Sequence, residues 1–236
     1  MKIPRSLFLS FFLIQFCYAQ NFNFSAYIGK NFPSKTYLTI SQDINKTFLK
    51  FDDVKLTDKS FEFPLYYGVK LSYNLNFVSK FLFAELEFIH SKVYSDQEQI
   101  VKATGIYRDS LLDSYIRFGD IVQNFSISHG LNYLLLNFGY KFPVLAKVYP
   151  YFKFGAGISI PHFETTVDSL SFERYEVNDF VIQLAGGANL KLYKNFFGFL
   201  EFKYTQGEIL KAGIFGGTAD TNIKMFHFVF GLGYTF

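Results

Sequence analysis

Five side chains of the sequence could do chemistry together if the fold brings their segments to one place. The imidazoles of His90 and His129, with the carboxylate of Glu62, could bind a divalent metal ion or act in general acid–base catalysis. Lys92 offers a positive charge suited to a phosphate group, and Asn132 offers an amide that both donates and accepts hydrogen bonds. These five residues are the candidate catalytic set, and the identity of any metal or cofactor stays open.

The elements that must position this set are three consecutive segments with alternating apolar and polar residues, the pattern of β-strands. The carboxylate opens the segment 60–74, the first histidine and the lysine end the segment 81–93, and the second histidine and the asparagine open the segment 124–141. Antiparallel neighbours bring such ends to one rim of a sheet. A shared rim site is therefore predicted.

A structural network that orders two long hairpins is the alternative to an active site at this rim. We expect Glu62 and His129 to lie near each other, because both of their strands flank the strand that carries His90. His90 is out of phase with Glu85 and Glu87, so it points to the same side only if a bulge intervenes. The phase of this histidine favours the structural alternative.

Eight stretches of the chain alternate in this way, and the last of them, 222–236, is the clearest. Its even positions are aromatic or leucine from Phe226 to Phe236, whereas its odd positions are small or mixed. The predicted strands are approximately 22–30, 60–74, 81–93, 124–141, 149–161, 179–193, 196–207 and 222–236. The uncharged stretch 121–140 is long enough for a spanning helix, but its serine, asparagine, histidine and glycine residues favour a strand.

The gaps between these strands alternate between short turns and long polar segments, which is typical of outer-membrane β-barrels. The long gaps are 31–59, 94–123, 162–178 and 208–221, and we predict them to be extracellular loops in which His162 and Glu164 are solvated. Backbone groups in lipid must all be paired, so the sheet has to close. The predicted fold is an all-β, closed, eight-stranded antiparallel transmembrane β-barrel.

One face of the predicted strands is apolar and the other carries charges. An eight-stranded barrel is only wide enough for side chains to fill it, so we predict a polar plug and no wide pore. The charges expected in this plug are those of Glu62, Glu85, Glu87, Glu201, Lys70, Lys141, Lys153, Lys191 and Lys203.

The N-terminus has the pattern of a secretory signal peptide. Lys2 and Arg5 precede an apolar run, and Cys17-Tyr18-Ala19 predicts cleavage before Gln20. The predicted organisation is a signal peptide at 1–19 and one barrel domain at 20–236. Residues 1–19 carry two of the 23 basic residues and none of the 20 acidic ones, so the mature net charge would be +1. That charge gives no support for nucleic-acid binding.

The architecture resembles the OmpA-like and opacity-type family of small outer-membrane barrels. In outer-membrane barrels a terminal phenylalanine is an assembly signal, which implies that Phe236 is read by the barrel assembly machinery. The resemblance implies a bacterial outer-membrane location, contact with membrane lipid and lipopolysaccharide, and a structural or surface-interaction role for the long loops. Oligomeric state is left open.

A second, narrower resemblance concerns three segments that look like patterns in lipid A oxidase-like barrels. They are 59–68, 88–94 and 128–132, and they contain the five candidate residues. The chain departs from that pattern at Leu56-Thr57-Asp58, where a tryptophan and a glycine are expected. The resemblance implies, as the alternative function, a lipid A-modifying enzyme with its site at the extracellular rim and Lys92 on a lipid A phosphate.

Overall fold

The computed structural model describes residues 21–143 and 147–236, and the signal peptide predicted at 1–19 lies outside them. Eight strands form a ring. They are β1 (Phe22–Pro33), β5 (Tyr67–Asn74), β6 (Leu82–Ser95), β9 (Val122–Lys141), β10 (Val148–Val167), β12 (Asn178–Tyr193), β13 (Phe196–Ile214) and β14 (Gly217–Thr235). The other elements are β2 (Thr36–Gln42), β3 (Thr47–Val54), β4 (Leu56–Thr57), β7 (Ile100–Tyr107), β8 (Ser110–Arg117), β11 (Leu170–Tyr175) and the 3-10 turn η1 (Phe118–Asp120).

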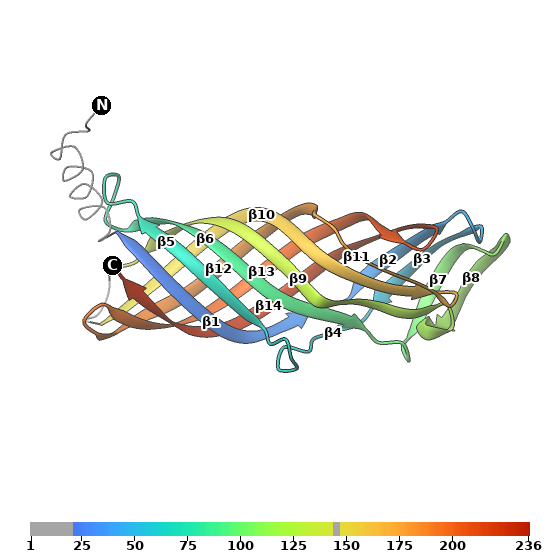
Figure 1. The fold of residues 1–236 in the computed structure, drawn as a ribbon, viewed down its shortest axis with the longest axis horizontal. Coiled ribbons are helices and arrows are strands. Elements are labelled where there is room, and N and C mark those ends of the chain that lie inside the picture. The colour runs from blue at the N-terminus through green and yellow to red at the C-terminus, as the bar shows by residue number, and fades with distance from the viewer. Residues whose placement is uncertain (1–20, 144–146) are drawn as a thin grey trace, which may run out of the picture.

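The ring is closed, because the first and last strands pair with each other. The order is β1-β5-β6-β9-β10-β12-β13-β14, and β14 returns to β1 with register partners from Asn23–Thr235 to Pro33–Met225. Every neighbour is antiparallel. The strands cross the long axis of the molecule at a tilt, and β1 begins at the same end of the barrel at which β14 ends (Figure 1). The predicted fold class is confirmed.

Six of the eight predicted strands agree closely with the ring strands over their barrel portions, and the first also begins as predicted. The exception is the predicted strand 60–74, of which only Tyr67–Asn74 is β5. Residues 59–66 instead form a turn in which the Glu62 amide donates to the Lys59 carbonyl, 3.1 Å away. Glu62 was predicted to line the lumen, and that prediction is wrong.

The uncharged stretch 121–140 lies almost wholly in strand β9, as predicted. Within 21–143 and 147–236 no helix has the length and hydropathy needed to cross a membrane.

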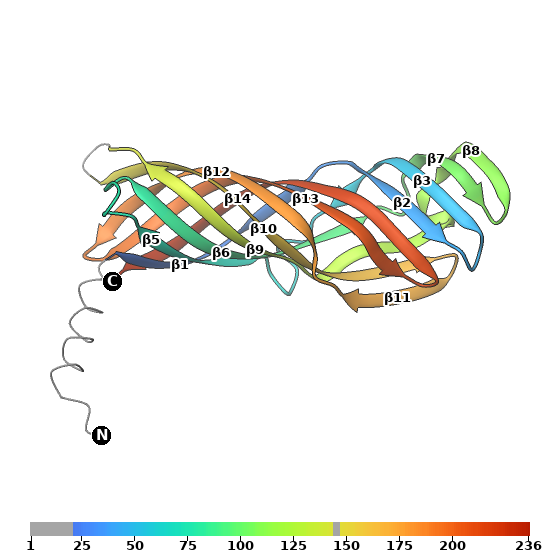
Figure 2. The ribbon, with the colours of Figure 1, turned by 90° about the horizontal axis from the view of Figure 1, so that it is seen from above.

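The long gaps were predicted to be loops, but much of them is sheet. Beyond the ring, β14 pairs with β2, and the order continues β2-β3-β7-β8. These strands extend the molecule at the end opposite the start of β1 and the end of β14 (Figure 2). We call this region, with β4, β11 and the adjoining ends of β6, β9, β10, β13 and β14, the cap.

Along the same strands, the outer face changes from apolar in the barrel to more polar in the cap. In the barrel half of β14, Phe226 and Phe230 are exposed and His227 is buried. In the cap half, Ile223 and Ala219 are buried, whereas Asp220 is only partly so. Apolar side chains on the outer face suit a region surrounded by lipid. A region surrounded by water needs its apolar side chains on the inner face. The cap therefore has a hydrophobic core, which includes Leu38, Ile40, Leu49, Phe51, Phe118 and Phe163.

Candidate functional site

Glu62 and Lys92, two of the candidate residues, meet through a backbone group and not through their charges. The Lys92 ammonium donates to the Glu62 carbonyl oxygen at 2.8 Å, beneath the turn at 59–66. The Glu62 carboxylate is exposed and lies 3.1 Å from the Lys59 ammonium. Lys92 thus holds the turn against the rim, and its side chain is buried.

His90 and Asn132 form a second pair, on neighbouring strands in direct register. The His90 Nδ1 lies 2.8 Å from the Asn132 Oδ1, and the Asn132 amide donates to the Ile160 carbonyl at 3.2 Å. The His90 ring stacks on the exposed Tyr67 ring with centroids 5.0 Å apart. No register shift separates Glu87 from His90, so this histidine keeps the outward phase expected without a bulge.

His129 belongs to a third group, and a bulge in β9 puts it there. From Leu131 to Ser126 the strand takes five steps, while β10 takes three from Pro161 to Glu164. The extra residues include Gly130, whose φ of 137° is a conformation that side-chain-bearing residues rarely adopt. His129 leaves the ladder here, and its Nδ1 lies 2.6 Å from the Glu164 Oε1.

The five candidate residues therefore divide into three contact groups, and their common site is not assembled by the contacts of the described residues. Glu62 and His129 have separate partners, Lys59 and Glu164, and their expected proximity stays a prediction. The catalytic roles assigned to Glu62, His90, Lys92, His129 and Asn132 stay predictions, as does the lipid A-modifying activity.

His162 and Glu164 were predicted to be solvated in a loop, and this prediction is wrong. Both lie in the cap portion of β10, where their side chains are 12% and 22% exposed. They alternate with the buried Phe163, so they share the outer face of the strand. With His129 they form a cluster of two imidazoles and one carboxylate. The spacing His-x-Glu on a strand was the available signal for this pair.

The lumen of the barrel is filled by a buried network of opposite charges. Lys153 contacts three carboxylates, and its ammonium lies 2.9 Å from Glu87 and 3.2 Å from Glu201. The network consists of the three lysines Lys70, Lys153 and Lys203 and the three glutamates Glu85, Glu87 and Glu201. Paired and hydrogen-bonded charges are tolerated in such a place, and the predicted polar plug is present.

Hydrogen-bonding side chains complete the network. The Tyr27 hydroxyl donates to Glu87 at 2.7 Å, the Tyr151 hydroxyl donates to Glu201 at 2.6 Å, and the Gln183 amide donates to Glu87 at 2.7 Å. Each carboxylate thus has several donors, which is what a buried charge requires.

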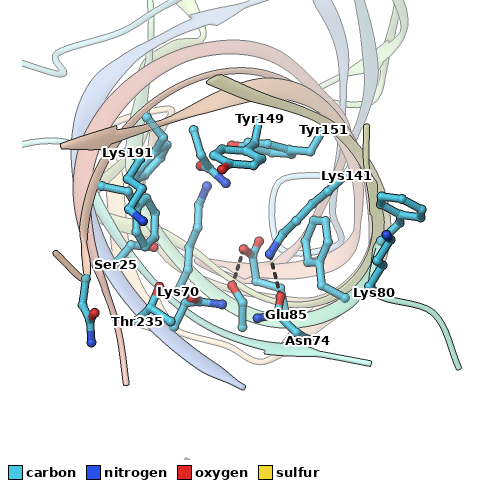
Figure 3. A pocket seen from close by; sticks show the side chains of 18 of the residues that line it. Ser25, Lys70, Asn74, Lys80, Glu85, Lys141, Tyr149, Tyr151, Lys191 and Thr235 are labelled. Atoms are coloured by element: carbon cyan, nitrogen blue, oxygen red, sulfur yellow. Dashed lines mark hydrogen bonds between the residues drawn. The ribbon is translucent and has the colours of Figure 1, made fainter. Parts of the chain in front are cut away.

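Below the network, a cavity of about 650 Å³ opens at the end with the short turns. Its lining includes one glutamate, Glu85, and five lysines: Lys70, Lys80, Lys141, Lys191 and Lys194. We call this cavity the vestibule. Figure 3 shows Lys70 and Lys141 reaching into the vestibule, and Lys141 donates to the Asn74 side chain at 2.6 Å. Lys191 was predicted in the charged plug but is exposed here. The vestibule is positively charged and ends at the plug.

Comparison with known proteins decides the family. Residues 30–236 match the family described as outer membrane protein beta-barrel domain. The chain belongs to this family. It is a protein of the bacterial outer membrane, and its short turns and vestibule are at the end that faces the periplasm in such barrels.

Three solved structures are among those that are similar to this chain. Neisserial surface protein A is 12% identical, with 91% of this chain and 97% of that chain covered and a TM-score of 0.46. Ail, the attachment invasion locus protein of Yersinia pestis, is 13% identical, with 92% and 99% covered and a TM-score of 0.41. AlkL in lipid bilayers is 14% identical, with 92% and 90% covered and a TM-score of 0.46. Among curated protein sequences, none matches this chain.

Proposed function

We propose that this barrel is a surface-interaction protein whose cap binds an extended polypeptide segment at the open edge of strand β8. The observation that carries the proposal is a row of exposed apolar side chains that runs to this edge. Strand addition at a sheet edge uses main-chain hydrogen bonds for affinity and neighbouring side chains for specificity.

The apolar row crosses three strands in direct register. Phe48 on β3 pairs with Ile106 on β7, and Ile106 pairs with Leu111 on β8. Their exposed fractions are 43%, 42% and 86%, so exposure is greatest at the edge. The opposite face of this hairpin is the cap core, where Val101 and Ala103 are buried. An exposed apolar row on an otherwise amphipathic sheet marks an interaction surface.

The edge itself fits a second copy of the same strand. β8 is the last strand in the sheet order, paired only with β7 among the described strands. Antiparallel pairing of two copies about Tyr115 would place Asp113 of each opposite Arg117 of the other. Opposite charges across a ladder are favourable, and such a contact has the two-fold symmetry of most dimers.

Contacts between loop tips hold this surface in shape before any partner binds. The Tyr107 hydroxyl donates to Asp168 at 2.6 Å, and the Arg108 guanidinium lies 3.2 Å from the same carboxylate. Partial burial and this hydrogen bond raise the pKa of Tyr107. Lys46 also contacts Asp109 at 2.8 Å, but this pair is exposed and adds little to the stability of the surface. A preorganised surface loses less entropy on binding.

The filled lumen also supports a function outside the barrel. Lys153, Glu87, Glu201 and Lys203 are each no more than 2% exposed between the vestibule and the cap. An interior packed in this way leaves the outer surface as the place for contact with other molecules.

The test uses the purified barrel in detergent micelles and a fluorescent peptide with the sequence of residues 110–117. We expect saturable binding by fluorescence anisotropy, and at least about tenfold weaker binding to the double variant L111K/Y115K, since lysine on an edge strand opposes pairing. Ile44→Lys is the matched control, because Ile44 is 61% exposed in the turn between β2 and β3. A scrambled peptide controls for general hydrophobic binding.

Two results would contradict the proposal. One is absence of binding to the parent protein at peptide concentrations near 1 mM, the weak limit of specific recognition at about −4 kcal/mol. The other is equal binding to the parent and to L111K/Y115K, which would place the contact elsewhere.

A further inference from the structure

We propose that His129, His162 and Glu164 bind one divalent transition-metal ion, of the zinc type, on the outer face of the barrel at the border of the cap. The site is separate from the β8 edge and does not depend on the proposed surface interaction.

The geometry of the three side chains fits a metal ion. One ligand atom of each lies within 4.8 Å of the other two. Glu164 Oε1 is 2.6 Å from the His129 Nδ1 and 3.5 Å from the His162 Nδ1. Ligands of a tetrahedral zinc lie roughly 3.3 Å apart, given metal–ligand bonds of about 2.0–2.1 Å. Only small side-chain shifts are needed to admit the ion.

The donor set selects the class of metal. Two imidazole nitrogens and one carboxylate oxygen suit zinc and its first-row neighbours, whereas calcium and magnesium prefer oxygen ligands alone. Three protein ligands leave a fourth position for water or for a group from a bound molecule. The proposed site therefore keeps one open coordination position, unlike a structural metal site in which four protein ligands close the coordination.

An unpaired nitrogen points to a ligand that the protein alone does not supply. His162 Nδ1 is buried and makes no hydrogen bond among the described residues. Its ring is packed on the Tyr175 ring with centroids 4.2 Å apart, which limits its movement. A buried polar atom without a hydrogen bond is costly, and a metal ion would satisfy it.

Charge around the site also favours a cation. Glu164 on β10 is directly opposite Glu173 on β11 in the strand register. Like charges in that position repel each other, and a divalent ion between or beside them offsets the repulsion. The Ser128 hydroxyl donates to the Glu164 carboxylate and would orient it, as outer partners of metal ligands do.

The fold builds the site from two local irregularities. The bulge in β9 at Gly130 turns His129 out of the ladder toward β10. In β10, His162 and Glu164 are two residues apart and so share the outer face. The ion would tie the β9 bulge to the β10–β11 hairpin.

The experiment measures zinc binding by the full folded barrel in detergent after treatment with a chelator. We expect one Zn2+ per chain by isothermal titration calorimetry, and cobalt substitution should give the visible absorption of a tetrahedral site. His162→Asn and Glu164→Gln should each weaken binding at least about tenfold. Lowering the pH from 7.5 to 5.5 should also weaken it, since metal ligation needs neutral imidazole.

Glu208→Gln is the matched control, because this exposed carboxylate on β13 lies outside the cluster. Folding is checked for each variant by its heat-dependent migration on electrophoresis. His129→Ala serves if a variant of the more buried residues fails to fold, since the His129 side chain is 65% exposed. Zinc binding that is absent from the parent, or that survives His129→Ala and Glu164→Gln unchanged, would overturn the site.

Discussion

The lumen and the cap are two cores of opposite chemistry within one set of strands. The lumen holds charges that are paired with one another among buried apolar residues such as Leu135 and Val229, whereas the cap core consists mainly of apolar side chains. The difference follows from what surrounds each core. Lipid accepts apolar groups on the outside and leaves polar groups to the interior, whereas water imposes the reverse arrangement. A single strand such as β10 obeys both rules along its length.

The two cores should respond differently to the loss of one side chain, and the lumen should respond most. Glu87→Ala removes a carboxylate that contacts Lys153 and Lys203 and accepts hydrogen bonds from Tyr27 and Gln183. Two lysines would then share too few acceptors in a closed space. We expect a loss of roughly 3–5 kcal/mol in the free energy of unfolding, measured by urea titration in lipid vesicles.

The control for this change is Glu208→Ala, which removes an exposed carboxylate and should alter stability by less than about 0.5 kcal/mol. Similar losses for Glu87→Ala and Glu208→Ala would mean that the lumen charges are hydrated and that the network does not stabilise the barrel.

The outer surface of the barrel should show the next largest effect. Leu200 on β13 is 55% exposed and shares the apolar outer face with Phe202. Leu200→Arg should cost roughly 2–4 kcal/mol if the residue lies near the bilayer midplane. The same titration measures it, and Leu200→Met is the apolar control. A cost below about 1 kcal/mol would place Leu200 at the membrane surface.

The sequence predicted the barrel strands because their alternation is long and regular. The stretch 222–236 has Phe226, Phe228 and Phe230 on one side and His227 on the other, so it is interpreted as a strand. The cap strands were missed because they are short and because their polar residues face out. Thr39 and Ser41 made 31–59 look like a loop, although Leu38 and Ile40 alternate with them and are buried.

The candidate site was harder to predict because it depends on where strands lose register. The phase of His90 could be read from the sequence, and it is outward as expected. The partners of His129 could not be read from the sequence, because the bulge at Gly130 sets the direction of the His129 side chain. Its partner Glu164 lies in a strand extension that was predicted to be a loop. The count of residues between strands does not reveal which strand carries the bulge.

A conservative change in the cap core should have a moderate and local effect. Ile40 is 1% exposed in β2, and Ile40→Val removes one methylene group from the cap core. We expect a loss of about 0.5–1.5 kcal/mol. Hydrogen exchange should become several-fold faster for β2 and β3 amides and stay unchanged for β12, because local regions can open separately. Equal acceleration in β12 would indicate that cap and barrel unfold as one unit.

The smallest effect should come from an exposed ion pair of the cap, which is the counterpart of the buried pairs in the lumen. The Lys46 ammonium lies 2.8 Å from the Asp109 carboxylate, but the two side chains are 67% and 72% exposed. Water and salt screen such a pair, and holding two mobile side chains together has an entropic cost. We therefore expect Asp109→Asn to change the stability of the cap by no more than about 0.5 kcal/mol.

Asparagine is the appropriate replacement because Asp109 has a φ of 67°, a left-handed conformation that asparagine also tolerates. The change then removes the charge without straining the turn. Hydrogen exchange of the β7 and β8 amides, measured at low and high salt, gives the size of the effect. If Asp109→Asn cost as much as Glu87→Ala, burial would not be what separates the two kinds of ion pair. The lumen and the cap would then differ in how their side chains pack and not in how strongly their ion pairs stabilise them.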